Sequence, residues 1–498
     1  MTGETTLRNN CVGNPALPAR LEPWMHEFLT SDRIVQLVTK YDSPLNVICP
    51  SPMSRNIAEI QSEMETRGVR SKIFFARKAN KCLSFVDEAI RCEAGVDTAS
   101  ENELRQCLQR GVRPDDIICT AAVKSDDLID CCISNQVCIA IDNRDELDAV
   151  VDRCRAVGKR TPIAIRLGGF LHDDSLHRLP ADDEQQSHAD NLPQATKLPT
   201  RFGFDAATDT GIIEQLSQLP VEVRGVHFHL DGYDAGQRVS GINQSLRWIE
   251  RLRSAGHRPS FLDIGGGFPI SYLDDGEQWE TFWHQHERAL LGRREPVTYH
   301  NHGLGLMEHQ GHILGRRNSY PYHQSPVRGD WMANILDSVI EGNTIAELLR
   351  QARIELRCEP GRSLLDGCGM TISRVEFRKQ NADGDWLIGL SMNRTQCRTS
   401  SDDFLVDPIL LRTNRSADDP KSGFLVGAYC TESELISLRK LSFPQGVARG
   451  DLVVFPNTAG YLMHFLESRS HQFPLAKNLV VSETLSAMKL DEIDRRDD

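Results

Sequence analysis

Short apolar runs alternate with longer amphipathic stretches along most of this chain. Such alternation is typical of β/α units around a parallel sheet, in which each strand is followed by a helix. After a lead-in run at residues 45–49, the runs that we expect to be strands are residues 73–76, 95–98, 116–119, 137–141, 163–167, 223–229, 261–264 and 354–358. Eight strands, each followed by helical sequence, predict a closed (β/α)8 barrel rather than an open sheet.

Helical periodicity predicts helices between these strands, among them residues 100–110, 144–157 and 242–255. Ser100 stands where an N-cap is expected, and Glu103 follows three residues later, as in a capping box. Residues 331–351 also have helical character, but this stretch is too long for one certain helix.

Two connections are far longer than the roughly two to six residues usual between a strand and its helix. Residues 168–222 begin with a polar segment rich in His and Asp, and residues 270–353 contain Thr298-Tyr-His-Asn-His-Gly. Both inserts follow strands at the end of the barrel where loops build active sites. We interpret them as substrate-shaping loops or lids, and a solvated surface loop is the alternative for each.

The pattern changes beyond residue 364. Short strands are predicted at residues 385–390, 424–426 and 451–455, separated by turn signals and with little helical periodicity. We therefore expect a barrel over residues 45–364 and a second, mostly β domain over residues 365–498. The length of 498 residues also favours two domains over one compact core.

Composition narrows the possible functions. The formal charge is 57 − 70 = −13 and there is no polybasic block, which argues against a nucleic-acid partner. No apolar run approaches the about 18 residues of a membrane helix, and residues 1–20 lack the layout of a signal peptide. The fourteen cysteines are scattered and form no Cys-x-x-Cys pair. We expect a cytoplasmic protein with reduced thiols and no membrane association.

A lysine follows the first predicted barrel strand, in Phe74-Phe-Ala-Arg-Lys78-Ala-Asn-Lys. At that position Lys78 would project into the barrel mouth, where desolvation lowers the pKa of an amine and leaves it nucleophilic. A solvated lysine at the rim is the alternative.

Polar groups also follow three later strands. Gly265, Gly266 and Gly267 would let backbone N–H groups approach a phosphate, although a tight turn explains a glycine triplet equally well. Glu359 and Arg362 could hold a protonated nitrogen and an oxyanion of one ligand, or instead form a salt bridge with each other.

In His227-Phe-His229 the period of two places both imidazoles on one face of the strand, and the last could stack on a planar ring. A histidine satisfied within the core is the alternative. A lysine, a phosphate turn, a flat stacking group and a Glu for a ring nitrogen, all at strand ends of one barrel, together describe a site for pyridoxal 5′-phosphate (PLP).

The chain resembles the fold-type III PLP-dependent amino-acid decarboxylases, the group that contains ornithine, arginine and diaminopimelate decarboxylases. The resemblance rests on motifs that occur in order: the Lys78 segment, Asp97 within residues 96–104, Lys124-Ser, Asp142 with Glu146, Arg166, residues 201–204, His229, residues 265–267, residues 359–362, residues 427–432 and residues 459–461. It implies an alanine-racemase-like barrel, PLP as cofactor and decarboxylation of an amino acid or amino-acid-like substrate.

The resemblance also implies roles for individual residues. Lys78 would form a Schiff base with the cofactor, His229 would stack on its ring, and Cys430 would return a proton to the substrate Cα. Either Glu432 or Glu434 would face the substrate. The implied cofactor contacts are Lys78, Asp97, Arg166, His229, Gly265, Gly266, Gly267, Glu359, Gly361, Arg362 and Tyr461.

In the family, the cysteine and the neighbouring acidic residue come from the partner subunit, so the resemblance implies a homodimer with shared active sites. It also implies that residues 1–44 join the second domain.

The chain departs from the family pattern in several places. Arg77 replaces a small apolar residue, and Leu230-Asp231-Gly-Tyr233 replaces an apolar–Gly–Ser segment that contacts the phosphate; Tyr233 could take over that contact. Gly389-Leu-Ser-Met-Asn-Arg394 and Ser401-Asp-Asp403 replace a motif near the substrate end. The substrates of the named family members are therefore not transferred to this chain.

Two other functions remain open. An amino-acid racemase on the same barrel would place an arginine near the ring nitrogen, where this chain has Glu359. A non-catalytic regulatory homologue would have lost the cofactor. Seven histidines between His284 and His323 could suggest a metal, but no accompanying cysteine or tight His-x3-His pair supports one, and we expect no metal site.

Overall fold

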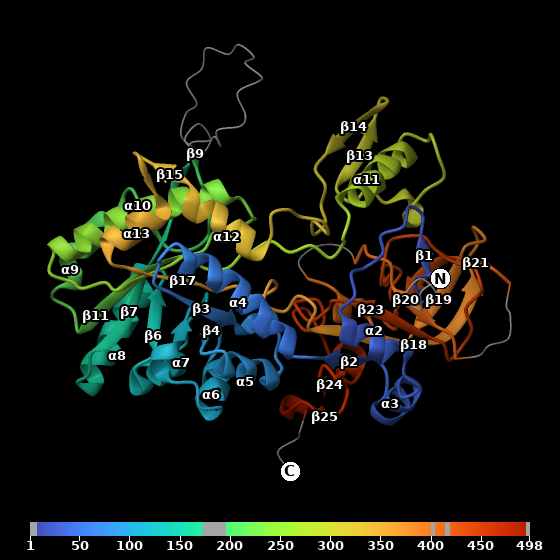
Figure 1. The fold of residues 1–498 in the computed structure, drawn as a ribbon, viewed down its shortest axis with the longest axis horizontal. Coiled ribbons are helices and arrows are strands. Elements are labelled where there is room, and N and C mark those ends of the chain that lie inside the picture. The colour runs from blue at the N-terminus through green and yellow to red at the C-terminus, as the bar shows by residue number, and fades with distance from the viewer. Residues whose placement is uncertain (1–6, 173–195, 400–403, 414–418, 495–498) are drawn as a thin grey trace.

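The computed structural model describes residues 7–172, 196–399, 404–413 and 419–494. Eight parallel strands form a closed barrel, shown on the left in Figure 1. They are β3 (Ser71–Ala76), β4 (Gly95–Thr98), β5 (Ile117–Cys119), β6 (Cys138–Ile141), β7 (Thr161–Gly168), β11 (Val221–Phe228), β12 (Phe261–Asp263) and β17 (Glu355–Cys358). The barrel closes because β17 pairs with β3 and β6 pairs with β7. The predicted (β/α)8 barrel is confirmed.

Amphipathic helices cover the barrel, and their apolar faces join the barrel strands in one large core. They are α4 (Ser51–Thr66), α5 (Leu83–Arg91), α6 (Glu101–Gln109), α7 (Asp126–Asn135), α8 (Arg144–Val157), α9 (Ile212–Leu216), α10 (Ala235–Ser254), α12 (Arg328–Asp337) and α13 (Ile345–Ala352). Parallel barrel strands are buried on both faces, and for this reason they occur in the sequence as short apolar runs.

Local signals explain where these helices begin. In α6 the Ser100 side chain accepts from the Glu103 N–H, whereas the Glu103 carboxylate accepts from Ala99, so the capping is only partly reciprocal. Helix α10 begins earlier than the expected residue 242 because Asp234 caps it. The stretch 331–351 contains two helices, α12 and α13, separated by a short turn between β15 (Val339–Ile340) and β16 (Asn343–Thr344).

The second sheet has ten strands and forms the β region on the right in Figure 1, which confirms the predicted mostly β domain. Its strands are β1 (Val12–Gly13), β2 (Leu45–Ile48), β18 (Gly369–Gln380), β19 (Trp386–Leu390), β20 (Ile409–Leu411), β21 (Lys421–Val426), β22 (Leu441–Phe443), β23 (Leu452–Pro456), β24 (Lys477–Val481) and β25 (Met488–Leu490).

Strand β2 belongs to this second sheet and not to the barrel. It pairs antiparallel with β18 and parallel with β24. Helices α2 (Pro23–Thr30) and α3 (Ile34–Tyr41) bury apolar residues in the same cluster as β2 and β18. We therefore propose a domain boundary after Ile48, which corrects the expected boundary before Leu45.

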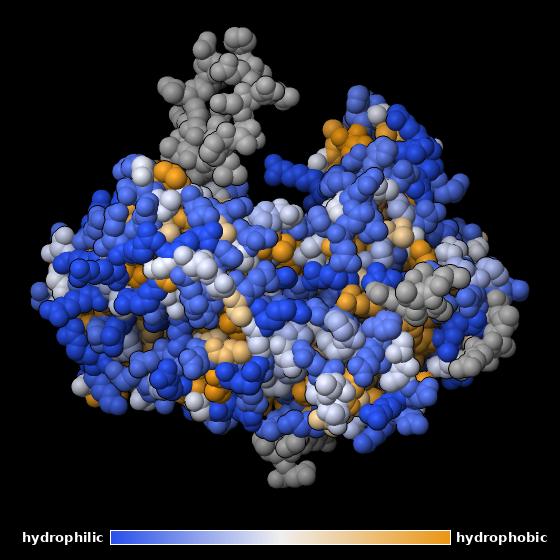
Figure 2. All heavy atoms as spheres, viewed as in Figure 1, coloured by the Kyte–Doolittle hydropathy of each residue, from blue (hydrophilic) through white to orange (hydrophobic). Residues whose placement is uncertain are grey.

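Helices α12 and α13 at the end of the second insert cover the barrel, whereas the earlier part of the insert packs on the β domain. It contains α11 (Gly276–Leu290) and the hairpin of β13 (Leu306–His309) and β14 (His312–Gly315), which project above the second sheet in Figure 1. Aromatic residues of the insert, including Tyr272 and Tyr322, share an apolar cluster with the second sheet. Figure 2 shows an apolar patch at the hairpin, where Met307 and Leu314 are exposed.

The first insert contributes β8 (Leu171–His172), β9 (Thr196–Lys197) and β10 (Phe204–Asp205), of which β10 extends the barrel sheet beside β7. Residues 173–195 of this insert, and Asp402 and Asp403, lie outside the described residues. None of the described helices combines the length and apolar composition needed to cross a membrane. None of the fourteen cysteines, all of which lie in the described part of the chain, forms a disulfide bond.

Candidate active site at the barrel mouth

Lys78 lies in a single 3-10 turn, Arg77–Ala79, directly after β3. Its Nζ is 2.7 Å from Oδ2 of Asp97, a fully buried carboxylate in the adjacent strand β4. The register of β3 and β4 pairs Ala76 with Asp97, so the turn after Ala76 brings the amine to the carboxylate. The Thr120 hydroxyl donates to the other Asp97 oxygen.

The pKa of Lys78 differs from the expectation. Burial lowers it, but the Asp97 carboxylate, together with Tyr461 and Glu359, more than offsets burial and raises the pKa above the ordinary value. The expected lowering of the Lys78 pKa is thus wrong, because that expectation rested on desolvation and not on the neighbouring acid.

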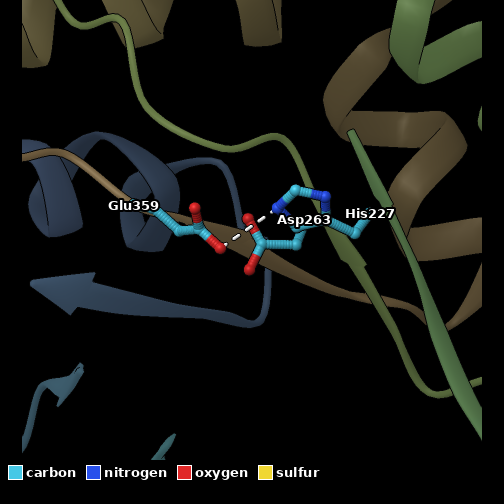
Figure 3. Close-up of side chains that lie close together, drawn as sticks. All are labelled: His227, Asp263 and Glu359. Atoms are coloured by element: carbon cyan, nitrogen blue, oxygen red, sulfur yellow. Dashed lines mark hydrogen bonds and ion pairs between the residues drawn. The ribbon is translucent and has the colours of Figure 1, made fainter. Parts of the chain in front are cut away.

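Glu359, His227 and Asp263 lie together at the ends of three adjacent strands (Figure 3). The register pairs His227 with Asp263, and Glu359 follows β17 on the other side of β12. His227 Nε2 and Glu359 Oε1 are 3.1 Å apart, and all three residues are buried. His227 and His229 share one face of the chain at the end of β11, where His227 meets Glu359 and His229 lies one step closer to the barrel mouth.

Burial dominates the electrostatics of this cluster. Desolvation raises the pKa of Glu359, while Lys78 and Arg166 oppose the rise. Desolvation and the nearby Glu359 raise the pKa of Asp263 well above its usual range, although Asp263 accepts a hydrogen bond from the Gly265 N–H at 2.9 Å. Burial lowers the pKa of His227 far below its usual value, which leaves a neutral imidazole.

The predicted glycine turn has no room for side chains. A Cβ on Gly265 would lie 2.6 Å from the Phe228 carbonyl oxygen, and one on Gly266 would lie 2.8 Å from the Glu359 carbonyl oxygen. Gly265 and Gly267 also have φ values of 65° and 85°, which favour glycine. The turn therefore lies against the ends of β11 and β17 and presents bare backbone.

Arg362 is surrounded by hydroxyl groups and not by acids. Its Nη1 donates to the Tyr272 hydroxyl at 3.0 Å and to the Gly460 carbonyl at 3.1 Å, and its guanidinium lies 4.2 Å from the centre of the Tyr320 ring. Among the described residues no carboxylate lies within ion-pair distance of Arg362. The alternative of a salt bridge between Glu359 and Arg362 is therefore not seen.

Tyr461 joins the β domain to the lysine turn. Its backbone N–H donates to the Ala79 carbonyl at 2.8 Å, and its φ is 70°. A Cβ on Gly361 would lie 2.8 Å from the Tyr461 hydroxyl, so glycine at that position leaves room for the phenol. The Tyr461 ring also lies 5.3 Å from the Arg362 guanidinium.

His229 and Arg166 complete the mouth. His229 directly follows β11, and burial together with the Lys78 and Arg166 charges lowers its pKa well below the usual value. Arg166 in β7 is 3.4 Å from the Asp142 carboxylate and lies against the Phe202 ring. Phe202 also meets His229 edge to face.

These residues fit PLP. Burial raises the pKa of Asp97, Asp263 and Glu359, and the Glu359 carboxylate further raises that of the two aspartates, so a protonated ring nitrogen would relieve the excess of negative charge. After β17, Arg362 lacks an acidic partner among the described residues, and a phosphate would supply one. The glycine turn leaves backbone amides that a phosphate can approach.

The structure does not bring the predicted cysteine segment to this cluster within one chain. Cys430 is exposed after β21, and no hydrogen bond or ion pair among the described residues links it to Lys78. Glu432 is exposed, whereas Glu434 is buried and accepts from the Arg394 backbone N–H at 2.7 Å. Glu432 is thus the more accessible of the two acids.

Several site residues were not assigned from the sequence. Asp263 is an acid within an apolar strand, and Arg238 is a cation on the face of α10 that also carries Ile242. In both cases a charged residue at a position expected to be buried could have been recognised in the sequence. Tyr272 and Tyr320 had none, because they reach Arg362 only through the folding of the second insert.

Comparisons with known proteins agree with this geometry. Residues 52–296 match the model of the pyridoxal-dependent decarboxylases, pyridoxal binding domain. The uncharacterized protein y4yA of Sinorhizobium fredii is 28% identical over 453 residues, which cover 89% of each chain. The diaminopimelate decarboxylase of Halalkalibacterium halodurans is 23% identical over 445 residues, 86% of this chain and 85% of the relative.

Solved structures share the fold. The Paramecium bursaria Chlorella virus arginine decarboxylase bound to agmatine superposes with a TM-score of 0.63 at 18% identity, over 90% of this chain and 99% of the viral chain. The chain belongs to the fold-type III PLP-dependent decarboxylase family. It is accordingly a PLP-dependent amino-acid decarboxylase, a carboxy-lyase, and PLP is its cofactor.

Proposed function

We propose that this enzyme removes the α-carboxylate of an amino acid or amino-acid-like substrate, with Lys78 as the residue that carries the cofactor and Cys430 as the proton donor to Cα. The observation that carries the proposal is the 2.7 Å contact of the Lys78 amine with buried Asp97, within one barrel mouth that also holds Glu359 and the glycine turn. PLP, when bound, withdraws electrons from the substrate Cα.

Each residue then has a task that its surroundings support. Asp97 holds the proton of the Lys78 amine and can accept it when the amine must become nucleophilic. Glu359 would hold a proton at the ring nitrogen, and the His227 imidazole 3.1 Å away would orient the carboxylate. His229, kept neutral by burial, offers a flat ring at the mouth.

Cys430 would serve a site in a second copy of the chain. Its exposure, and the absence among the described residues of a link to Lys78, support supply across a homodimer interface with shared active sites. Phe465 and Leu466, in the segment after Tyr461, are 50% and 40% exposed, as expected of residues that a second subunit covers.

The second insert supports a distinct substrate end. A cavity of about 430 Å³ is lined by Tyr299, His300 and His302 of this insert together with Arg394, Arg398 and Glu432. Because Glu432 is two residues from Cys430, we propose that the cavity accommodates the far end of the substrate. The histidines His300 and His302 then act as substrate contacts and not as metal ligands.

A racemase is the second candidate. Its ring nitrogen would face an arginine, whereas here Glu359 and His227 occupy the corresponding strand ends. Carbon dioxide released from carboxyl-labelled amino acids supports decarboxylation, and inversion of Cα without release would contradict it. For the third reading, a regulatory protein without cofactor, purified protein that stays colourless after PLP is added would be the supporting result.

The central experiment uses two variants. Lys78→Ala should lose the visible absorption of lysine-bound cofactor, while Cys430→Ala should keep it and decarboxylate slowly or misprotonate Cα. Mixing the two impaired variants should raise activity to about a quarter of wild type, because half of the randomly formed dimers contain one intact shared site. No restoration on mixing would refute the shared site. The free thiols support a cytoplasmic location.

A further inference from the structure

A buried arginine lies beside the glycine turn. Arg238 is in the first turn of α10, and its side chain is fully buried. Its Nη2 donates to the Leu230 carbonyl at 2.9 Å and to the Gly232 carbonyl at 2.8 Å, and lies 3.5 Å from the Gly266 carbonyl. A Cβ on Gly267 would overlap this nitrogen. The guanidinium therefore fills the space between the turn and the loop that follows His229.

The charge of Arg238 is not neutralised locally. Nη1 and Nε are buried and have no hydrogen-bond partner, and no carboxylate among the described residues lies within ion-pair distance. Burial lowers the pKa of Arg238 to about 10, which the more distant Asp234 and Asp231 oppose. A guanidinium that remains charged in the interior normally has an anion nearby.

The loop held by Arg238 is the one that departs from the family. Leu230-Asp231-Gly-Tyr233 stands where the family has an apolar–Gly–Ser phosphate contact. The Tyr233 carbonyl accepts from Trp331 Nε1 at 2.8 Å, and the Trp331 ring lies 5.9 Å from the Arg238 guanidinium. This loop is thus fixed from within by Arg238 and from outside by Trp331.

We propose that Arg238 is a positioning residue for the cofactor phosphate, which holds the loop after His229 against the glycine turn and supplies positive charge in place of the missing serine contact. The phosphate of PLP carries a charge of about −2 at neutral pH. Arg238 lies beside the turn, Arg362 follows β17, and neither has an acid partner among the described residues, so their two charges together would match that of the phosphate. This inference rests on the proposed function, because it concerns the same site.

The test compares PLP with pyridoxal, which lacks only the phosphate. Full-length protein stripped of cofactor is titrated with each compound, and the dissociation constants are read from the visible absorption of cofactor bound to Lys78. Arg238→Met should weaken PLP binding by roughly ten- to a hundredfold, the range for a lost charged interaction, and pyridoxal binding by less than about twofold. Arg238→Lys should recover part of the preference for PLP.

Arg77→Met is the matched control. Arg77 is also a buried arginine that donates to carbonyls, those of Asn80 and Lys81, but it belongs to the turn that carries Lys78 and makes no hydrogen bond with the glycine turn in the described part of the chain. Its loss should change the affinities for PLP and pyridoxal by equal factors. A second measurement uses inorganic phosphate, which should raise the melting temperature of cofactor-free wild type but not that of cofactor-free Arg238→Met.

Equal losses for both compounds in Arg238→Met, or unchanged affinity for both, would overturn the inference and leave the proposed function standing. If Arg238→Met does not fold, Arg238→Gln keeps a donor without the charge and must show the same selective loss. Wild type that forms no absorption band with either compound would instead contradict the proposed role of Lys78.

Discussion

Replacing Asp97 by Asn tests whether this carboxylate controls the Lys78 amine. The two groups are 2.7 Å apart. At that distance Coulomb's law gives about 1.5 kcal/mol in water and about 6 kcal/mol at an effective dielectric constant of about 20. With about 1.36 kcal/mol for each pKa unit, Asp97→Asn should lower the Lys78 pKa by roughly 1 to 4 units. The lower half of this range is the better expectation, because the Lys78 side chain is 32% exposed and water screens the pair.

The sign of the effect follows from the direction of the shift. Asp97 raises the Lys78 pKa above its ordinary value, so the charged amine stabilises the folded protein at neutral pH, and this stabilisation is lost as pH rises through the folded-state pKa. Without the carboxylate the amine loses its proton at lower pH. The neutral amine is the form that attacks an aldehyde. Its reaction should therefore begin at a lower pH in Asp97→Asn.

The assay is the rate at which pyridoxal, added to cofactor-free protein, produces the absorption of the Lys78-bound form, measured from about pH 6 to 10 around the ordinary lysine value. The rate profile of Asp97→Asn should move to lower pH by at least about one unit. Thr120→Val is the control, because it removes the hydrogen bond to Asp97 but keeps the charge. Superimposable profiles for Asp97→Asn and wild type would show that the carboxylate does not set the amine's pKa.

Three further predictions concern neighbouring residues. Gly266→Ala should lower the free energy of unfolding in denaturant by about 1–3 kcal/mol, since its Cβ would lie 2.8 Å from the Glu359 carbonyl oxygen; a change under about 0.5 kcal/mol would contradict the close contact. His227→Leu should slow decarboxylation about tenfold in a carbon dioxide assay, and His227→Gln, which keeps a donor for Glu359, should recover part of the loss. Because the pKa of His229 is lowered in the folded protein, the unfolded chain takes up this proton first as pH falls below about 6.5, and the folded protein loses stability. His229→Asn should reduce this loss in the free energy of unfolding by up to about 1.4 kcal/mol per pH unit. An unchanged pH dependence would refute the neutral imidazole.

The barrel could be predicted because its strands are apolar on both faces and therefore stand out as short runs between polar turns. The same property misled the assignment of β2, whose buried pattern does not tell which sheet it joins. The second insert could not be predicted, since the packing of α11 on the second sheet depends on aromatic contacts between distant parts of the chain.

The site shows the same division. Lys78, Asp97 and Glu359 could be placed because parallel strands end at one edge, so their positions follow from topology. The raised pKa of Lys78 and the hydroxyl groups around Arg362 could not be predicted in this way. Both depend on distances between side chains, which the apolar pattern and the residue spacing of the sequence do not give.

The arrangement of charge explains why three separate parts of the chain are needed for one site. The barrel strands bring together three buried acids, and the barrel cations Lys78 and Arg166 do not fully offset the effect of burial on Asp97 and Glu359. The second insert brings Tyr272, and the β domain brings the Gly460 carbonyl, to Arg362; both are neutral groups that leave the positive charge of Arg362 available to an anion. A ligand that is positive at its ring and negative at its phosphate relieves both imbalances at once. Cofactor binding should therefore stabilise the contacts between the barrel, the insert and the β domain as well as the site itself.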